Sequence, residues 1–216
     1  MQQTPGNKPC PTPGKLMMTA GAVLLLCAAL LLGYNQWDDY RAGRESQTVA
    51  AALIDEMGSR QASVTQMEVQ SDEEAQARQL SVLELDGAYY VGLLTIPTLD
   101  RTLPVQSDWS EEKLKHSPCR YSGSLEEGEL VVAAHNYKNH FGGINRLSVG
   151  DSVIFTDLDE KQYFYEVQEI STVDAADIEG MTQSGYDLSL FTCNYDRSLR
   201  ITVRCMRVYG GVGATQ

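Results

Sequence analysis

An uncharged apolar segment near the N-terminus is the feature that most limits how this chain can fold. Residues 16–34 comprise nineteen residues without a charged side chain, close to the roughly 20 residues that an α-helix needs to cross a bilayer. The segment ends in a poor signal-peptidase site, so an uncleaved anchor is favoured over a cleaved signal peptide. Tyr34 and Trp37 fit the aromatic belt found at membrane surfaces. The sequence therefore predicts a transmembrane helix.

The position of this helix predicts four parts of the chain: a cytoplasmic N-terminal tail (1–15), the anchor (16–34), a stalk or linker (35–82) and a folded domain (83–210). Two lysines precede the anchor and two arginines follow it, so the positive charges do not decide its orientation. The short tail favours an arrangement with the folded domain on the extracellular side. In the stalk, several apolar residues recur at helical spacing and would form a stripe along one face of a helix. They are Ala50, Ala51, Leu53, Ile54 and Met57. We expect a helical or partly disordered stalk that holds the next domain away from the membrane.

From about residue 83 the pattern changes to short strand-like runs separated by turn signals such as Ile96-Pro97 and Gly150-Asp151. Short helices are expected only at residues 110–116 and 142–147. Seven or eight short strands with minor helices predict an all-β class, either a β-barrel or a sandwich. The expected strands cover residues 89–96, 102–105, 129–135, 152–156, 162–170, 187–193 and 199–208.

The charge balance and the cysteine pattern argue against several functional classes. Seventeen basic and 29 acidic residues give a formal charge of −12, and an acidic protein repels the phosphates of a nucleic acid. The five cysteines form no Cys-x-x-Cys pair and no zinc-like spacing with histidine, so we expect no metal and no other cofactor. Acidic loops at 126–129 and 174–179 offer oxygen ligands for calcium, but solvated surface charge is the simpler interpretation.

Among the cysteines after the anchor, Cys193 is the candidate for chemistry. Strand alternation places Cys205 with Ile201 and Val203 on one face, as expected for a small buried residue. Cys119 lies in a probable turn, where we favour a structural role. Cys193 ends an apolar strand before a polar loop, the place where a rigid scaffold presents a reactive group. Composition alone leaves a structural and a reactive Cys193 equally open.

The histidine and arginine candidates follow from the same kind of position. His135 ends a strand, whereas His140 lies inside the following loop and His116 ends a charged helical turn. A surface or capping role is the ordinary alternative for such a histidine. With a six-residue connection at 194–199, Arg200 would stand opposite Cys193, and with five residues it would pair with Thr192 and face the other side. Arg197, in the loop, is the alternative cation.

Several segments, in their order and spacing, resemble the catalytic domain of sortases. Residues 131–136 (VVAAHN), 141–147 (FGGINRL) and Gly150-Asp151 resemble the sortase histidine region. Residues 188–193 (LSLFTC) resemble the nucleophile strand, and 199–203 (LRITV) resemble the strand that carries the arginine. Residues 92–97 and 103–105 resemble the first two barrel strands. The resemblance covers residues 90–208, and the form of the histidine region looks closest to class B sortases, although the long helical insertion of many class B members is absent.

This resemblance implies an eight-stranded sortase-type β-barrel and a cysteine transpeptidase. Such enzymes cleave an LPxTG-like sorting signal of a secreted protein and join it to an amine of a cell-wall precursor or a pilin lysine. The implied catalytic residues are Cys193 as nucleophile, His135 as acid and base, and Arg200 as the cation beside the oxyanion. Thr192 and Asn136 would contact the substrate. The family is anchored in the cell membrane with its catalytic domain outside, as the N-terminal helix also suggests.

Two other functions fit the same residues. A surface cysteine hydrolase would release the acyl group to water instead of an amine. A non-catalytic anchored β-domain would bind cell-wall polymer or a protein, with Cys193 and His135 in structural roles.

Overall fold

The computed structural model describes residues 13–67, 82–125, 128–193 and 198–209. It divides into two units, Met1–Asp39 and Tyr40–Gln216. One continuous helix of 55 residues, α1 (Pro13–Met67), begins in the first unit and ends in the second. In the described part of the chain, α1 is the helix that is long and apolar enough to span a membrane, with a mean hydropathy of 2.4 over its most apolar window.

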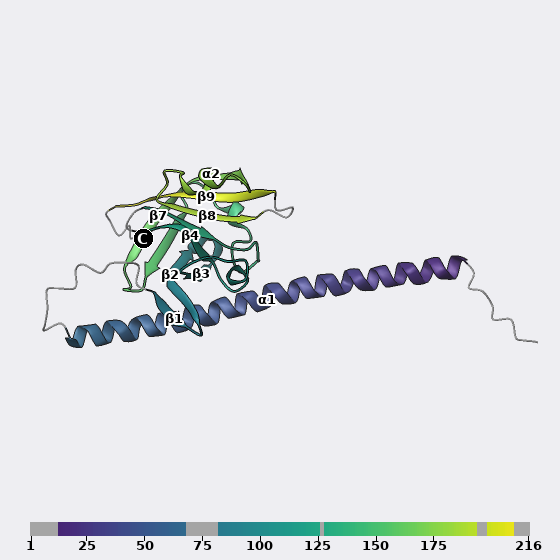
Figure 1. The fold of residues 1–216 in the computed structure, drawn as a ribbon, viewed down its shortest axis with the longest axis horizontal. Coiled ribbons are helices and arrows are strands. Elements are labelled where there is room, and N and C mark those ends of the chain that lie inside the picture. The colour runs from purple at the N-terminus through teal and green to yellow at the C-terminus, as the bar shows by residue number, and fades with distance from the viewer. Residues whose placement is uncertain (1–12, 68–81, 126–127, 194–197, 210–216) are drawn as a thin grey trace, which may run out of the picture. The chain divides into compact units, whose positions relative to one another are not determined.

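The second unit is built around a closed β-barrel (Figure 1). Its strands, in chain order, are β1 (Leu83–Leu85), β2 (Ala88–Ile96), β3 (Arg101–Gln106), β4 (Cys119–Ser124), β5 (Gly128–Ala133), β6 (Ser152–Asp157), β7 (Gln162–Asp174), β8 (Leu188–Cys193) and β9 (Leu199–Arg207). Around the barrel the order is β2-β3-β4-β5-β8-β9-β7-β6, and β6 pairs with β2 to close the ring. The ninth strand, β1, adds to the outside of β2. The predicted eight-stranded barrel is therefore confirmed.

Strand alternation decides which side chains fill the barrel. Leu188 and Leu190 of β8 point inward with Val203 and Cys205 of β9, and all four are fully buried. Apolar side chains from the other strands and from the loop after β5 complete this core, among them Leu94, Val105, Leu130, Phe141, Ile144, Phe155 and Val167. Because β5 and β8 run parallel, their carboxyl ends lie at the same edge of the barrel.

The part of α1 that belongs to the second unit packs on the barrel. Ala50, Leu53 and Met57 are buried against Tyr90 and Leu93, which point outward from β2. The outward direction is possible because a bulge between Tyr90 and Gly92 shifts the register of this strand. Of the helical stripe predicted from the sequence, Ala50, Leu53 and Met57 thus lie against the barrel, whereas Ala51 and Ile54 are exposed.

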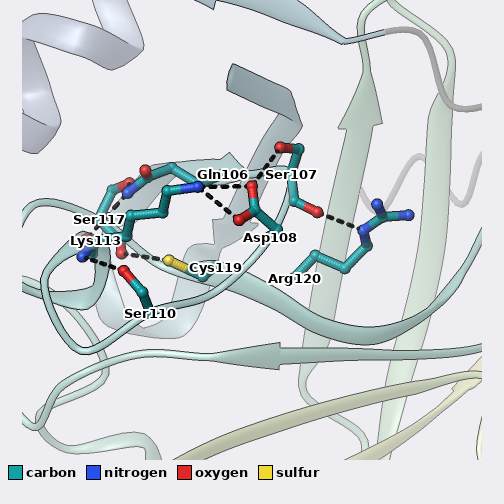
Figure 2. A network of polar contacts seen from close by, with 8 residues as sticks. All are labelled: Gln106, Ser107, Asp108, Ser110, Lys113, Ser117, Cys119 and Arg120. Carbon is teal, nitrogen blue, oxygen red and sulfur yellow. Dashed lines mark hydrogen bonds and ion pairs between the residues drawn. The ribbon is translucent and has the colours of Figure 1, made fainter. Parts of the chain in front are cut away.

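A polar network shapes the connection between β3 and β4 (Figure 2). Nε2 of Gln106 donates to the carbonyl oxygen of Lys113 (3.0 Å) and to Oγ of Ser117 (2.9 Å). The ammonium group of Lys113 contacts Asp108 Oδ2 at 2.6 Å, which closes the connection into a compact loop. The 3₁₀ turn η3 (Lys113–Lys115) lies inside this loop and buries Leu114.

The differences from the sequence expectations are local. The helices expected at 110–116 and 142–147 are the short 3₁₀ turns η3 and η4 (Ile144–Arg146). Cys119 does not lie in a turn but begins β4, a strand whose pairing with β5 contains two register shifts. The predicted tail at 1–12 and the stalk residues 68–81 lie outside the described residues.

Candidate active site

The hairpin of β8 and β9 brings Cys193 and Arg200 together. The two residues are direct partners in the antiparallel ladder, so the register that the sequence left open is the one with Arg200 opposite Cys193. Nη1 of Arg200 donates a hydrogen bond to Sγ of Cys193, with 2.8 Å between the two atoms. The guanidinium is a permanent cation, so it can stabilise negative charge on the sulfur or on a carbonyl oxygen beside it.

The neighbouring strand places His135 at the same end of the barrel. In the parallel ladder between β5 and β8, Ala133 is the partner of Phe191. The backbone N–H of Ala134 also donates to the carbonyl oxygen of Phe191 at 3.1 Å. His135 is two residues beyond Ala133, as Cys193 is two residues beyond Phe191. β5 ends at Ala133, so His135 does not end the strand as expected but lies two residues past it, at the barrel edge where β8 ends in Cys193.

Cys193 lies on the outer face of the barrel, where a second apolar cluster begins. Phe191, two residues earlier on β8, packs there with Val131 and Ala133 of β5. The ring of Phe191 meets the edge of Tyr121 at 5.1 Å between centroids, and the guanidinium of Arg200 lies 5.3 Å from the Phe191 centroid. Aromatic and apolar side chains thus form the floor next to the Cys193–Arg200 pair.

One side of this outer face is covered by the short helix α2 (Ile178–Thr182), which contributes the buried Met181. Arg204 of β9 holds α2 in place, since its guanidinium donates to the carbonyl oxygens of Gly180 (2.6 Å) and Met181 (3.0 Å). The same group donates to Oγ of Ser189 on β8 at 2.7 Å. Arg204 is only 4 % exposed, and burial lowers the pKa of its guanidinium. Its role is to fasten α2 to the strands that carry Cys193 and Arg200.

The loop after His135 is closed by its own backbone and by an arginine from β3. Phe141 N–H donates to the carbonyl oxygen of His135 at 3.2 Å, and Gly142 N–H donates to that of Tyr137 at 2.8 Å. Nη1 of Arg101 donates to the carbonyl oxygens of His140 (2.6 Å) and Gly142 (2.8 Å). A side chain at Gly142 would lie 2.5 Å from the carbonyl oxygen of Tyr137, so this close turn requires glycine.

His140, the poorer histidine candidate, is a core residue. Its side chain is fully buried, and neither ring nitrogen has a hydrogen-bond partner among the described residues. Burial is the main cause that lowers the pKa of His140 to about 4, so the ring is neutral near pH 7. A buried neutral ring fits a packing role, which the sequence did not predict.

The structure places the other predicted residues as follows. Cys119 and Cys205 are buried, and burial raises the pKa of each thiol to about 12, which makes both poor nucleophiles. Thr192 alternates with Cys193 and is buried, so its contact with a substrate stays a prediction. Asn136 directly follows His135 in the loop and is half-buried. Arg197, the alternative cation, lies outside the described residues.

Sequence reasoning did not find Arg101, Tyr137 or the function of Arg204. Alternation did place Arg204 on the same face as Arg200. Sequence alone predicts that a charged residue in a strand is exposed to solvent, and only the fold shows that α2 covers this one. Arg101 acts on a loop about 40 residues further along the chain, and a contact at that separation leaves no local signal.

Comparison with known proteins decides the family. A family model for the sortase domain matches residues 94–208, which is more than half of the chain. The chain belongs to the sortase family. One relative is sortase A of Bacillus anthracis. The two sequences are 23 % identical over 177 residues, and the match covers 79 % of this chain and 83 % of that protein. The protein is thus a cysteine transpeptidase.

Solved sortase structures share the fold. Sortase C1 of Streptococcus agalactiae is 27 % identical, with a TM-score of 0.51 over 60 % of this chain and 72 % of the other. Sortase C of Streptococcus pneumoniae, whose structure was described in connection with pilin substrate specificity, is 28 % identical, with a TM-score of 0.50 over 56 % and 67 %. These neighbours are class C enzymes, while the form of the histidine region resembles class B. The family acts on sorting signals at the cell surface, and the apolar part of α1 is consistent with a membrane anchor.

Proposed function

We propose that Cys193 is the nucleophile of this sortase, with His135 as general acid and base and Arg200 as the cation that binds the developing oxyanion. The contact between Arg200 and the sulfur of Cys193 is the observation that carries this assignment. Support comes from the register that sets His135 at the same barrel edge. The high pKa of the buried thiols of Cys119 and Cys205 also favours Cys193 over the other cysteines of the barrel.

The reaction follows in two steps of acyl transfer. The thiolate of Cys193 attacks the carbonyl carbon of the scissile peptide bond, and the C–N bond breaks as His135 gives its proton to the leaving amine. This leaves a thioester between Cys193 and the N-terminal part of the substrate. An incoming amine then attacks the thioester, His135 takes its proton, and the sulfur leaves as thiolate. In both steps Arg200 donates to the carbonyl oxygen while it carries negative charge.

The proposed substrate is a secreted protein with an LPxTG-like sorting signal near its C-terminus. The proposed acceptor is an amine of a peptidoglycan precursor or of a pilin lysine, and the class C neighbours favour the pilin over the precursor. Thr192 and Asn136 are proposed to contact the sorting signal near the nucleophile. The substrate arrives from outside the cell, so the anchor is proposed to place the barrel on the extracellular side of the membrane.

The decisive test is mass spectrometry of the full-length protein after incubation with a panel of sorting-signal peptides. We expect a covalent acyl adduct on Cys193 that disappears in Cys193→Ala and persists in Cys119→Ala. Arg200→Ala should lower the rate of adduct formation by roughly 10²-fold or more, the effect of removing one oxyanion donor. The matched control is Arg207→Ala, on the same strand but outside the site.

Adding an amine acceptor separates transfer from hydrolysis. A transpeptidase forms a peptide–amine conjugate when a short pilin-like lysine peptide or a peptidoglycan stem peptide is present. Release of free acid at an unchanged rate in the presence of both amines would instead show the surface hydrolase. An adduct on another cysteine, or none with any peptide, would overturn the assignment of Cys193.

A further inference from the structure

Helix α1 contacts the loop that carries His135 at Gly43. Gly43 is buried there, and a Cβ on Gly43 would lie 2.7 Å from both Cβ and Cγ of Asn139. Rotation of the Asn139 side chain cannot relieve this contact, because its Cβ is bonded directly to the loop backbone. Helix and loop are therefore in contact at a position where only glycine fits.

A second contact ties the same turn of α1 to the connection between β3 and β4. Oε2 of Glu45 lies 2.8 Å from Nδ1 of His116. The ring of His140 lies against the backbone of Ala42, which contributes to the electrostatics of that ring. Three successive contacts from Ala42, Gly43 and Glu45 thus hold this part of the helix against two loops of the barrel.

The loop transmits a displacement at Asn139 because it is short and internally bonded. His140 N–H donates to the carbonyl oxygen of Tyr137 at 3.0 Å, and Phe141 N–H donates to that of His135 at 3.2 Å. The ring of Tyr137 stands between two histidines, 5.2 Å from the His135 centroid and 5.4 Å from that of His140. Asn139 cannot shift without moving His140, and through Tyr137 the change reaches His135. Packed side chains of this kind move together.

We propose that α1 is a positioning element of the active site, in which the contact of Gly43 with Asn139 sets the orientation of the His135 imidazole through Tyr137 and His140. Gly43 and Asn139 are positioning residues, since neither bears on the reacting atoms directly. The inference rests on the proposed role of His135 as acid and base. It extends that role by making the helix that leaves the membrane part of the catalytic apparatus.

The test compares two glycine-to-alanine substitutions in the same helix of the full-length protein in detergent micelles. Gly43→Ala inserts a methyl group against Asn139, whereas a methyl group at Gly58 meets nothing within 4 Å. Alanine is the better helix former at both sites, so helix propensity does not explain a difference between them. With a sorting-signal peptide as the acyl donor, Gly43→Ala should lower kcat by roughly 10- to 100-fold, the loss expected for a displacement of about 1 Å. KM should change less than about twofold, and Gly58→Ala should match the wild type.

Rescue distinguishes positioning from general damage. Asn139→Gly removes the side chain that the new methyl group strikes, so Gly43→Ala/Asn139→Gly should recover most of the lost kcat. Asn139→Gly alone adds no bulk and tests the same contact if Gly43→Ala does not fold. It should lower kcat by less than Gly43→Ala does. No recovery in the double variant, together with a wild-type kcat for Asn139→Gly, would overturn the proposal.

A second measurement does not depend on turnover. The ¹H–¹³C signal of the His135 ring, recorded by NMR through a pH titration, should shift and broaden in Gly43→Ala and in Asn139→Gly but not in Gly58→Ala. A folded Gly43→Ala protein with an unchanged His135 signal would refute the coupling. If the wild type acts on no peptide, the proposed function is contradicted. The NMR comparison then still tests whether the contact between Gly43 and Asn139 affects His135.

Discussion

The buried His140 gives the protein a dependence of stability on pH that can be calculated. Its pKa is lowered by burial from 6.5 to about 4 in the folded protein, while in the unfolded chain the ring titrates near 6.5. Between these values the unfolded chain binds more protons, so the free energy of unfolding falls as the pH falls. The contribution is fully present above pH 6.5 and is lost as the pH drops toward 4. From pH 7 to pH 5 the expected loss from this one group is about 2 kcal/mol.

The assay is urea unfolding of a form that lacks residues 1–39, followed by the fluorescence of Trp109, the one tryptophan after residue 39. To isolate the contribution of this one ring, the wild type is compared with His140→Phe at both pH values. Phenylalanine fills the site without a titrating group. Between pH 7 and pH 5, the free energy of unfolding of His140→Phe should therefore fall by about 2 kcal/mol less than that of the wild type. Equal losses in His140→Phe and in the wild type would refute the reasoning.

Two further predictions concern α1 and α2. Leu53→Ala should lower the free energy of unfolding by about 2–5 kcal/mol, because Leu53 is fully buried against the barrel. Ile54→Ala, on the exposed side of the same turn, should change it by less than about 0.5 kcal/mol in the same urea assay. Arg204→Lys should raise KM for a sorting-signal peptide more than it lowers kcat, because lysine lacks the fork that holds α2. Arg207→Lys is its matched control, and equal KM values for the two variants would contradict that role.

The strands were predictable because their sequence pattern is local. Residues 187–193 and 199–208 were expected as strands, and β8 and β9 begin and end within one residue of those bounds. β4 was missed because its sequence, Cys119-Arg-Tyr-Ser-Gly-Ser124, combines weak strand formers with a glycine in the left-handed region. The stripe of Ala50, Leu53 and Met57 did show that one face of the helix is apolar. A stripe does not say what covers it, so the packing of these residues on the barrel required the fold.

The candidate site was found from strand ends, but its geometry depended on a loop length. Cys193 and His135 were predicted because each was expected to end an apolar strand before a polar loop. Cys193 does end β8, whereas β5 ends two residues before His135. Whether Arg200 faces Cys193 depended on the number of residues in the hairpin connection, and one residue fewer would have reversed its direction. The roles of Gly43, Asn139 and Tyr137 involve contacts between segments that are far apart in the sequence. No single-sequence pattern carries such contacts, so they required the fold.

Two buried or half-buried arginines fix the loops around the site in the same way. Arg101 donates from one nitrogen to two carbonyl oxygens of the His135 loop, and Arg204 donates to two carbonyl oxygens of α2. Both come from strands, so rigid elements hold the loops on either side of the Cys193–Arg200 pair. Guanidinium suits this task because its five N–H donors have fixed directions, whereas the three donors of a lysine ammonium rotate at the end of a flexible stem. Since the carbonyl groups are neutral, these contacts set loop positions without cancelling the cation. Substitution of either arginine should therefore disturb substrate contact or His135 orientation before it disturbs the chemistry of Cys193.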